Sequence, residues 1–288
     1  MAITADQVKK LREKTGAGMM DCKKALEKCD SDMEKAIHHL REQGIAKATQ
    51  KAARVAKEGL IFSDVRPQER LGVLLELNCE TDFVARTDDF KSLAREISTW
   101  IVENRPREIT QLNESMKDRL NQTIAKLGEN ITAKRFALLQ RNEKSAGIIH
   151  SYIHPGDKLG VLVKLQSQTD DAARDPEFTL LAKDVAMQIA ATNPLVIARD
   201  SLNPEIIEKE KDIYSTQAKN EGKPEKIIER IVQGKLEKYF QEVCLLEQAF
   251  VKDQDRSVKE RVAETEKKLD DEITVRQFVR FRLGDELA

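Results

Sequence analysis

The sequence is poor in the features that direct a protein to a particular compartment or surface. Its four cysteines lack the short paired spacing of a disulfide framework, which indicates a reducing compartment. The first residues have neither an apolar signal core nor an Arg/Ser-rich transit character, and no apolar run is long enough to span a bilayer. Charged residues make up 34% of the chain but balance to a net charge of -1, so no overall field attracts nucleic acid or an anionic membrane. We therefore expect a cytoplasmic protein with no nucleic-acid or membrane partner.

Signatures of catalysis, metal binding or cofactor binding are also missing. The Gly16-Ala-Gly18 turn has neither a preceding strand nor the Lys-Ser/Thr of a phosphate-binding loop. Cys22 and Cys29 have no second pair of zinc ligands. Cys79 and His154 form the one candidate nucleophilic pair, but no recognisable residue orients the imidazole and no pattern supplies an oxyanion hole. We expect no enzyme, metal or cofactor, and a thiol enzyme built on Cys79 stays open as an alternative.

What the sequence does contain is an internal repeat. A chain of 288 residues is too long for one small core and indicates two or three domains. Leu71-Gly-Val-Leu74 recurs as Leu159-Gly-Val-Leu162, and the same offset relates Thr81-Asp82 to Thr169-Asp170 and Phe90 to Phe178. In the first copy, Leu71 to Leu77 is typical of a strand buried on both faces, and the apolar spacing from Phe90 to Ile101 predicts an amphipathic helix with Asp88 as its N-cap. We infer two copies of one sheet-and-helix unit.

The two copies differ at one informative position. Phe83 in the first copy corresponds to Asp171 in the second. A core position would bury an unpaired carboxylate in the second copy, at a cost of several kcal/mol, so we expect this position to face solvent. An exposed aromatic ring that the fold does not require is a candidate for insertion into a partner. The alternative is that the copies pack differently and that Phe83 is an ordinary core residue.

Helical segments surround the repeat. Capping boxes at Thr4 and Ser31 predict helices in a three-helix unit over residues 1–40, followed by a polar helical linker. Residues 106–145 are expected to be mostly helical. Two charged amphipathic helices flank the turn at Gly222-Lys-Pro224 and predict an antiparallel hairpin that projects from the body. The alternation in Val279-Arg-Phe-Arg-Leu283 predicts a strand that joins the second sheet.

Two longer motifs carry a resemblance to a known family. They are LREKTGAGMMDCKKAL, from Leu11 to Leu26, and ELNCETDFVAR, from Glu76 to Arg86. Together they resemble the two signature motifs of the translation elongation factor Ts family, and the similarity covers nearly the whole chain. The resemblance implies an α+β fold with a small UBA-like (ubiquitin-associated-like) three-helix bundle, a core of two related sheet-and-helix subdomains, and an inserted antiparallel coiled-coil hairpin. One departure is the end of the chain at Ala288, where some members of the family continue into a further helix.

The resemblance also implies an organisation of the chain into five parts. These are an N-terminal domain over 1–40, a helical linker over 41–57, a first core subdomain over 58–145, a second over 146–202 and 244–288, and a hairpin over 203–243. The bundle alone is also compatible with a ubiquitin-binding adaptor, although that alternative leaves the repeated core unexplained. Self-association through the hairpin stays open.

Finally, the resemblance implies an activity and the residues that perform it. The expected partner is elongation factor Tu, the GTPase that delivers aminoacyl-tRNA, and the activity is guanine-nucleotide exchange without covalent chemistry. In the family, one turn enters the GTPase domain and dislodges the Mg²⁺ that holds GDP; here it comprises Thr81, Asp82, Phe83 and Val84. Further partner contacts are implied at His154, Gly156, Met19 and Met20.

Overall fold

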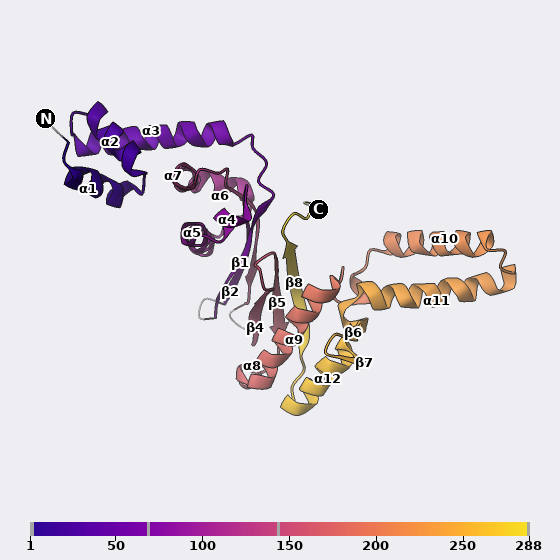
Figure 1. Cartoon of the computed structure of the whole chain (residues 1–288). Helices are drawn as coiled ribbons and strands as arrows, with labels where there is room; N and C mark the ends of the chain where they lie inside the picture. Colours follow the sequence, from indigo (N-terminus) through magenta and orange to yellow (C-terminus); the bar gives the residue numbers. More distant parts are fainter. Residues whose placement is uncertain (1–2, 68–69, 143–144, 287–288) are drawn as a thin grey trace.

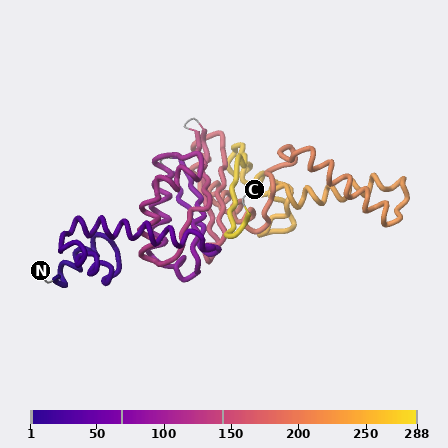
Figure 2. Tube along the Cα trace, turned by 90° about the horizontal axis from the view of Figure 1, so that it is seen from above, coloured from indigo at the N-terminus to yellow at the C-terminus, as the bar shows by residue number. Residues whose placement is uncertain are grey.

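The computed structural model describes residues 3–67, 70–142 and 145–286, and it combines helices with small antiparallel sheets. Figure 1 shows a helical bundle at the N-terminal end, two sheets with covering helices in the middle, and two long helices that project from the other side. Figure 2 shows the same elongated order from above. Separate helical and antiparallel layers of this kind confirm the expected α+β class. Among the described helices, none combines the length and the apolar character needed to cross a membrane.

The N-terminal bundle contains three helices: α1 (Ala5–Thr15), α2 (Met19–Lys28) and α3 (Met33–Lys51). They enclose a small apolar core in which Leu11 of α1 and Leu26 of α2 are fully buried. The third helix does not end near residue 40. It continues to Lys51, so the third bundle helix and most of the expected linker are one element.

Helix caps were only partly predicted. The capping box at Thr4 is confirmed. The cap expected at Ser31 is wrong, because Ser31 has a left-handed φ of 65° and the carboxylate of Asp32 accepts the first free amides of α3 instead. The cap expected at Asp88 is also wrong, since the hydroxyl of Thr87 caps the helix that follows the first sheet. In both cases the chain enters the helix one residue away from the expected position.

The first sheet has three antiparallel strands in the order β1-β2-β3: β1 (Glu58–Arg66), β2 (Leu71–Cys79) and β3 (Thr132–Gln140). The central strand β2 is buried along its whole length, as its continuous apolar run predicts. The covering helices are α5 (Asp88–Asn104), α6 (Ile109–Ser115) and α7 (Lys117–Leu127). Strand β3 contradicts the expectation that 106–145 is mostly helical. Gly128 ends α7 in a left-handed conformation, and the chain then returns to pair with β2.

The second sheet repeats this plan. Its strands lie in the order β4-β5-β8: β4 (Gly147–Ile153), β5 (Leu159–Gln166) and β8 (Thr274–Arg282). The expected C-terminal strand is therefore confirmed as part of β8. The helices α9 (Pro176–Thr192) and α12 (Val258–Leu269) pack on this sheet, next to a small hairpin of β6 (Ala249–Phe250) and β7 (Asp253–Ser257).

Two further helices, α10 (Pro204–Asn220) and α11 (Glu225–Val243), project beyond the second sheet (Figure 1). They lie side by side and run in opposite directions, and the turn between them includes Gly222 with φ of 70°. Their base is anchored by a small cluster that includes Leu236 and Phe240. The coiled-coil character of this pair and the UBA-like character of the bundle stay predictions.

The two sheets meet through equivalent patches. Ser63 of β1 donates a hydrogen bond to Ser151 of β4, which occupies the equivalent position in the other copy, at 3.1 Å between the hydroxyl oxygens. Leu74 and Leu162, another equivalent pair, are buried in the same apolar cluster between the sheets. The two copies therefore associate as the two halves of a symmetric dimer do, with the same surface used on both sides.

Gly160 of β5 allows the close approach of the two sheets, and this leads to a testable expectation. A Cβ atom there would lie 2.6 Å from Ile61 Cγ2, 2.8 Å from Ile153 Cδ1 and 3.0 Å from Leu74 Cδ1. Three neighbours cannot all retreat, so we expect Gly160→Ala to lower the free energy of unfolding by about 1–3 kcal/mol. Gly234 of α11 has no atom within 4 Å of such a Cβ, so Gly234→Ala is the control and should stabilise by about 1 kcal/mol. Urea unfolding followed by circular dichroism measures both changes; an unchanged Gly160→Ala midpoint contradicts the close packing.

Candidate functional site

Phe83 lies on a short turn at the end of the first sheet's central strand. Strand β2 ends at Cys79, and the one-turn helix α4 (Asp82–Ala85) begins after Thr81, whose hydroxyl accepts the amide of Val84. The Phe83 side chain is 78% exposed, the highest value among the exposed large apolar residues in the described part of the chain. The expectation that this position faces solvent is confirmed. We call residues 80–86 the Phe83 turn.

The second copy forms the same turn with a carboxylate in place of the ring. Helix α8 (Asp170–Arg174) follows Thr169, which caps it as Thr81 caps α4, and Asp171 is exposed. We call residues 168–174 the Asp171 turn. Since the same local structure forms with either side chain, the fold does not require a phenylalanine at position 83.

The other three residues of the expected Thr-Asp-Phe-Val contact are less available than the ring. Thr81 is half-buried, and Val84 packs against the core of the first sheet. Asp82 is partly exposed and forms an ion pair with Arg86 at 2.8 Å. Phe83 is therefore the residue of this turn whose apolar surface is free to enter a partner.

The turn between β4 and β5 lies beside the Phe83 turn. Asp82, Arg86 and Gly156 line one small hollow, so the structure brings Gly156 close to the Phe83 turn, which the sequence did not predict. Gly156 has φ of 94° and is exposed. The β4–β5 turn is fixed to the first sheet, because the amide of Ile61 donates to the carbonyl of Asp157 at 2.7 Å. The second copy is thus bonded to β1, the strand that α4 contacts.

His154, at the start of the same β4–β5 turn, is exposed, and its Nδ1 is 3.0 Å from the hydroxyl of Tyr152. Its hydrogen bond is with Tyr152 and not with Cys79. The Cys79 side chain is fully buried and its Sγ donates to the carbonyl of Thr81 at 3.1 Å. Burial raises the pKa of the Cys79 thiol to about 12, so it stays protonated at neutral pH. The alternative of a Cys79–His154 nucleophilic pair is therefore wrong. Across the described residues, no three His, Cys, Asp or Glu side chains gather as a metal site requires.

Met19 and Met20 lie on the N-terminal bundle, in a different part of the molecule from the Phe83 turn (Figure 1). They open α2 and are 53% and 61% exposed. The buried residues of α2 are Cys22, Ala25 and Leu26, so the two methionines are not needed for the bundle core. They form an apolar surface that a partner is able to cover.

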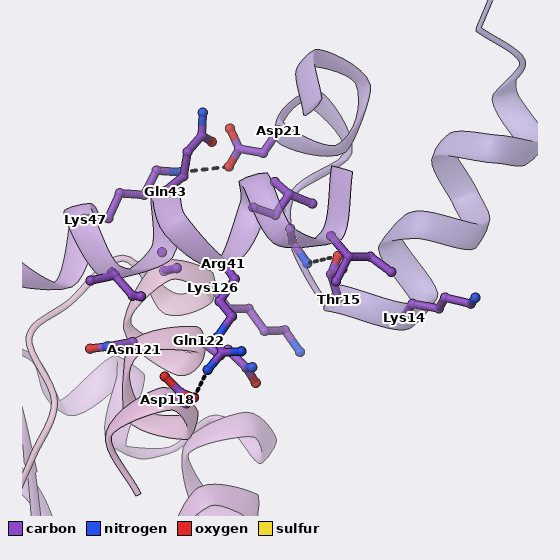
Figure 3. Close-up of a pocket in the computed structure, with 16 residues that line it drawn as sticks. Lys14, Thr15, Asp21, Arg41, Gln43, Lys47, Asp118, Asn121, Gln122 and Lys126 are labelled. Atoms are coloured by element: carbon purple, nitrogen blue, oxygen red, sulfur yellow. Dashed lines mark hydrogen bonds and ion pairs between the residues drawn. The ribbon is translucent and has the colours of Figure 1, made fainter. Parts of the chain in front are cut away.

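The bundle is fixed to the core through a joint between α3 and α7, shown in Figure 3. Arg41 of α3 forms an ion pair with Asp118 of α7. The two helices lie close together at Gly44, where a Cβ would meet the Cβ of Ala125 at an ordinary contact distance of 3.6 Å. This joint sets the position of α2, with its methionines, relative to the Phe83 turn.

The sequence matches known proteins over nearly its whole length. A family model described as "Elongation factor TS" matches residues 80–285. A protein of Clostridium botulinum (strain Loch Maree / Type A3) is 45% identical over 292 aligned positions, which cover 98% of this chain and 93% of that protein. A protein of Lawsonia intracellularis is 44% identical over 294 positions, covering 99% of this chain and 100% of that protein. Both relatives are named "Elongation factor Ts".

Proposed function

Since the chain belongs to the elongation factor Ts family, and so to the translation elongation factors, we propose that it is the guanine-nucleotide exchange factor of elongation factor Tu. In this proposal the chain binds elongation factor Tu carrying GDP, and the Phe83 turn enters the GTPase domain near the nucleotide. The entry displaces the bound Mg²⁺, GDP leaves, and GTP takes its place. The exchange involves no covalent step by the factor itself.

The observation that carries this proposal is the exposure of Phe83 on a turn that forms equally well without it. The residue is 78% exposed, and the equivalent position in the second copy holds Asp171. An aromatic side chain kept in water, at a position where the fold accepts a carboxylate, is better explained by a contact with a partner than by folding. Both the family's role in translation and the capping of this turn by Thr81 fit that contact.

The energetics require more than one contact surface. An exchange factor loosens GDP only by binding the nucleotide-free partner more tightly, and GDP then loosens the factor to the same extent. Accelerating release by about 10⁴-fold lowers the barrier by roughly 5.5 kcal/mol. Burying one phenylalanine yields only about 1.5–3 kcal/mol. Loss of Mg²⁺ supplies part of the barrier reduction that the phenylalanine does not provide, because the charge of the GDP diphosphate is then less neutralised. Binding energy from other surfaces must hold the ring in place.

We assign those surfaces to the parts that the family resemblance implies. The UBA-like bundle, with Met19 and Met20, docks on the GTPase domain. The β4–β5 turn, with His154 and Gly156, contacts a second domain of elongation factor Tu. The hairpin of α10 and α11 packs as a coiled coil and is available for self-association. The site of action is the cytoplasm, where translation takes place.

The test is release of a fluorescent GDP analogue from elongation factor Tu, followed by stopped flow. We expect the release rate to rise with the concentration of this protein until it saturates, and excess Mg²⁺ to oppose the effect. An unchanged release rate at saturating protein would reject the exchange function. Binding to immobilised ubiquitin without any effect on GDP release would favour an adaptor instead.

A further inference from the structure

A carboxylate from a distant part of the first subdomain holds the Phe83 turn. Glu129 follows α7 and precedes β3. One of its oxygens accepts the amides of Glu80 and Thr81, at 3.0 and 2.9 Å, and the other accepts the hydroxyl of Thr81 at 2.6 Å. Both carboxylate oxygens are therefore engaged within the chain. The three donors belong to the segment that leads directly into α4 and Phe83.

We call the hydrogen bonds from the Phe83 turn to Glu129 a clasp. The second copy has an equivalent clasp, formed by Asp271, and the turn that it holds has no aromatic residue. Asp271 follows α12 and precedes β8. Its carboxylate accepts the amides of Gln168 and Thr169, at 2.7 and 2.9 Å, and the hydroxyl of Thr169 at 2.5 Å. Burial opposes ionisation of Asp271, but the hydrogen bonds from Thr169 and Gln168 prevail and lower its pKa. This clasp provides a natural control, because it shares the geometry of the first but serves a turn without the ring.

The clasp at Glu129 also has a connection that the second clasp lacks. The neighbouring residue Asn130 is almost fully buried, and its amide donates to Glu80 Oε1 at 2.7 Å. Its side chain donates to the carbonyl of Arg54 at 2.7 Å, in the segment between α3 and β1. The Phe83 turn is therefore tied to the segment that carries the N-terminal bundle. In the second copy, Gln168 instead donates to Glu272, the neighbour of Asp271.

We propose that Glu129 is a positioning residue for nucleotide exchange: it fixes the Phe83 turn in the conformation in which the ring projects. The inference rests on the exchange function proposed above. Its two oxygens are occupied by Glu80 and Thr81, so Glu129 acts through the turn and not by touching the partner. Without the clasp, the turn samples other conformations, and only the fraction with the ring correctly placed enters the GTPase.

The experiment compares Glu129→Ala, Glu129→Gln and Asp271→Ala in the full chain. We expect Glu129→Ala to reduce the GDP release rate at saturating protein by about tenfold. Without the clasp, the conformation of the turn in which the ring projects becomes a minor fraction of the molecules. The concentration for half-saturation should change much less, because the other contact surfaces are intact. Glutamine keeps one acceptor oxygen for the two amides, so Glu129→Gln should restore most of the rate. Asp271→Ala should leave the release rate within about twofold of wild type, because its turn carries no ring.

Hydrogen–deuterium exchange of the free proteins supplies a readout that does not depend on the partner. Glu129→Ala should speed exchange in the peptide that contains Glu80 and Thr81, and Asp271→Ala should do the same for Gln168 and Thr169. If wild-type protein fails to accelerate GDP release, the exchange function fails and this inference falls with it. If wild type is active and Glu129→Ala loosens the turn without slowing release, the positioning role alone is wrong. Unchanged amide exchange in a variant contradicts the clasp that the variant removes. If Glu129→Ala does not fold, Glu129→Gln carries the test: its release rate should fall in step with faster amide exchange at Glu80 and Thr81, with an unchanged half-saturating concentration. Faster amide exchange in Glu129→Gln with a wild-type release rate would contradict the positioning role.

Discussion

Phe83→Ala should slow GDP release from elongation factor Tu at saturating protein by about 10- to 100-fold. This range is the free energy of burying one phenylalanine, about 1.5–3 kcal/mol, converted at about 1.4 kcal/mol per factor of ten. The substitution should not affect folding, because the ring is 78% exposed and α4 is capped by Thr81 and not by the aromatic side chain. Stopped-flow release of a fluorescent GDP analogue measures the rate, and urea unfolding checks the stability.

The repeat supplies the matched control for this substitution. Asp171→Ala removes the side chain at the equivalent position of the second copy, which is also exposed. We expect it to leave both the rate and the half-saturating concentration unchanged. A wild-type rate for Phe83→Ala would remove Phe83 from the mechanism. A large loss for Asp171→Ala would mean that the two copies share the work.

The sequence predicted the structure correctly where a single local property, such as apolar character or a helix cap, determined the conformation of a segment. The apolar run from Leu71 specified a buried central strand, and the capping box at Thr4 marked the start of α1. The replacement of Phe83 by Asp171 predicted exposure because a carboxylate is costly to bury. In each case a local property of the residues decided the outcome without knowledge of distant contacts.

The missed elements depend on such distant contacts. Strand β3 is stabilised by pairing with β2, about 60 residues earlier in the chain, and its own residues alternate weakly between buried and exposed positions. A second repeat does mark it. Glu129, Ile131-Thr132 and Phe136 correspond to Asp271, Ile273-Thr274 and Phe278 at a different offset from the first repeat. The offset changes because the helices α10 and α11, with their flanking segments, interrupt the second copy. Comparing the copies in this register would have found both β3 and the clasp.

The structure also shows what the second copy contributes to the first. Glu129 of the first copy holds the Phe83 turn, and Asp157 of the second copy accepts the amide of Ile61 in β1, the strand that α4 contacts. A single three-stranded sheet would leave one face of β2 in water, whereas the paired sheets bury it completely. The second copy therefore keeps the fold of the repeat with a carboxylate, Asp171, in place of the aromatic ring.

The second large effect is expected at the N-terminal bundle, on binding and not on rate. Replacing Met19 and Met20 together by alanine should raise the concentration needed for half-saturation by about 10- to 100-fold, since burying exposed methionine side chains contributes about 1.5–3 kcal/mol in total when burial is partial. The release rate at saturation should stay at the wild-type value. Both side chains are more than half exposed and alanine is a better helix former, so α2 should remain folded.

This behaviour is the reverse of that expected for Phe83→Ala, and the comparison separates anchoring from displacement. A contact that holds the complex equally before and after GDP leaves changes affinity alone, whereas a contact that is made only as GDP leaves changes the rate. Ile213→Ala on α10 removes another exposed apolar side chain and should alter neither quantity. A triple variant with alanine at Met19, Met20 and Phe83 should show both the higher half-saturating concentration and the slower release, nearly additively. The reason is that the bundle surface and the Phe83 turn lie on different elements. An unchanged half-saturating concentration for the double methionine variant would show that the bundle surface does not anchor the partner, and the binding energy would then have to come from the β4–β5 turn.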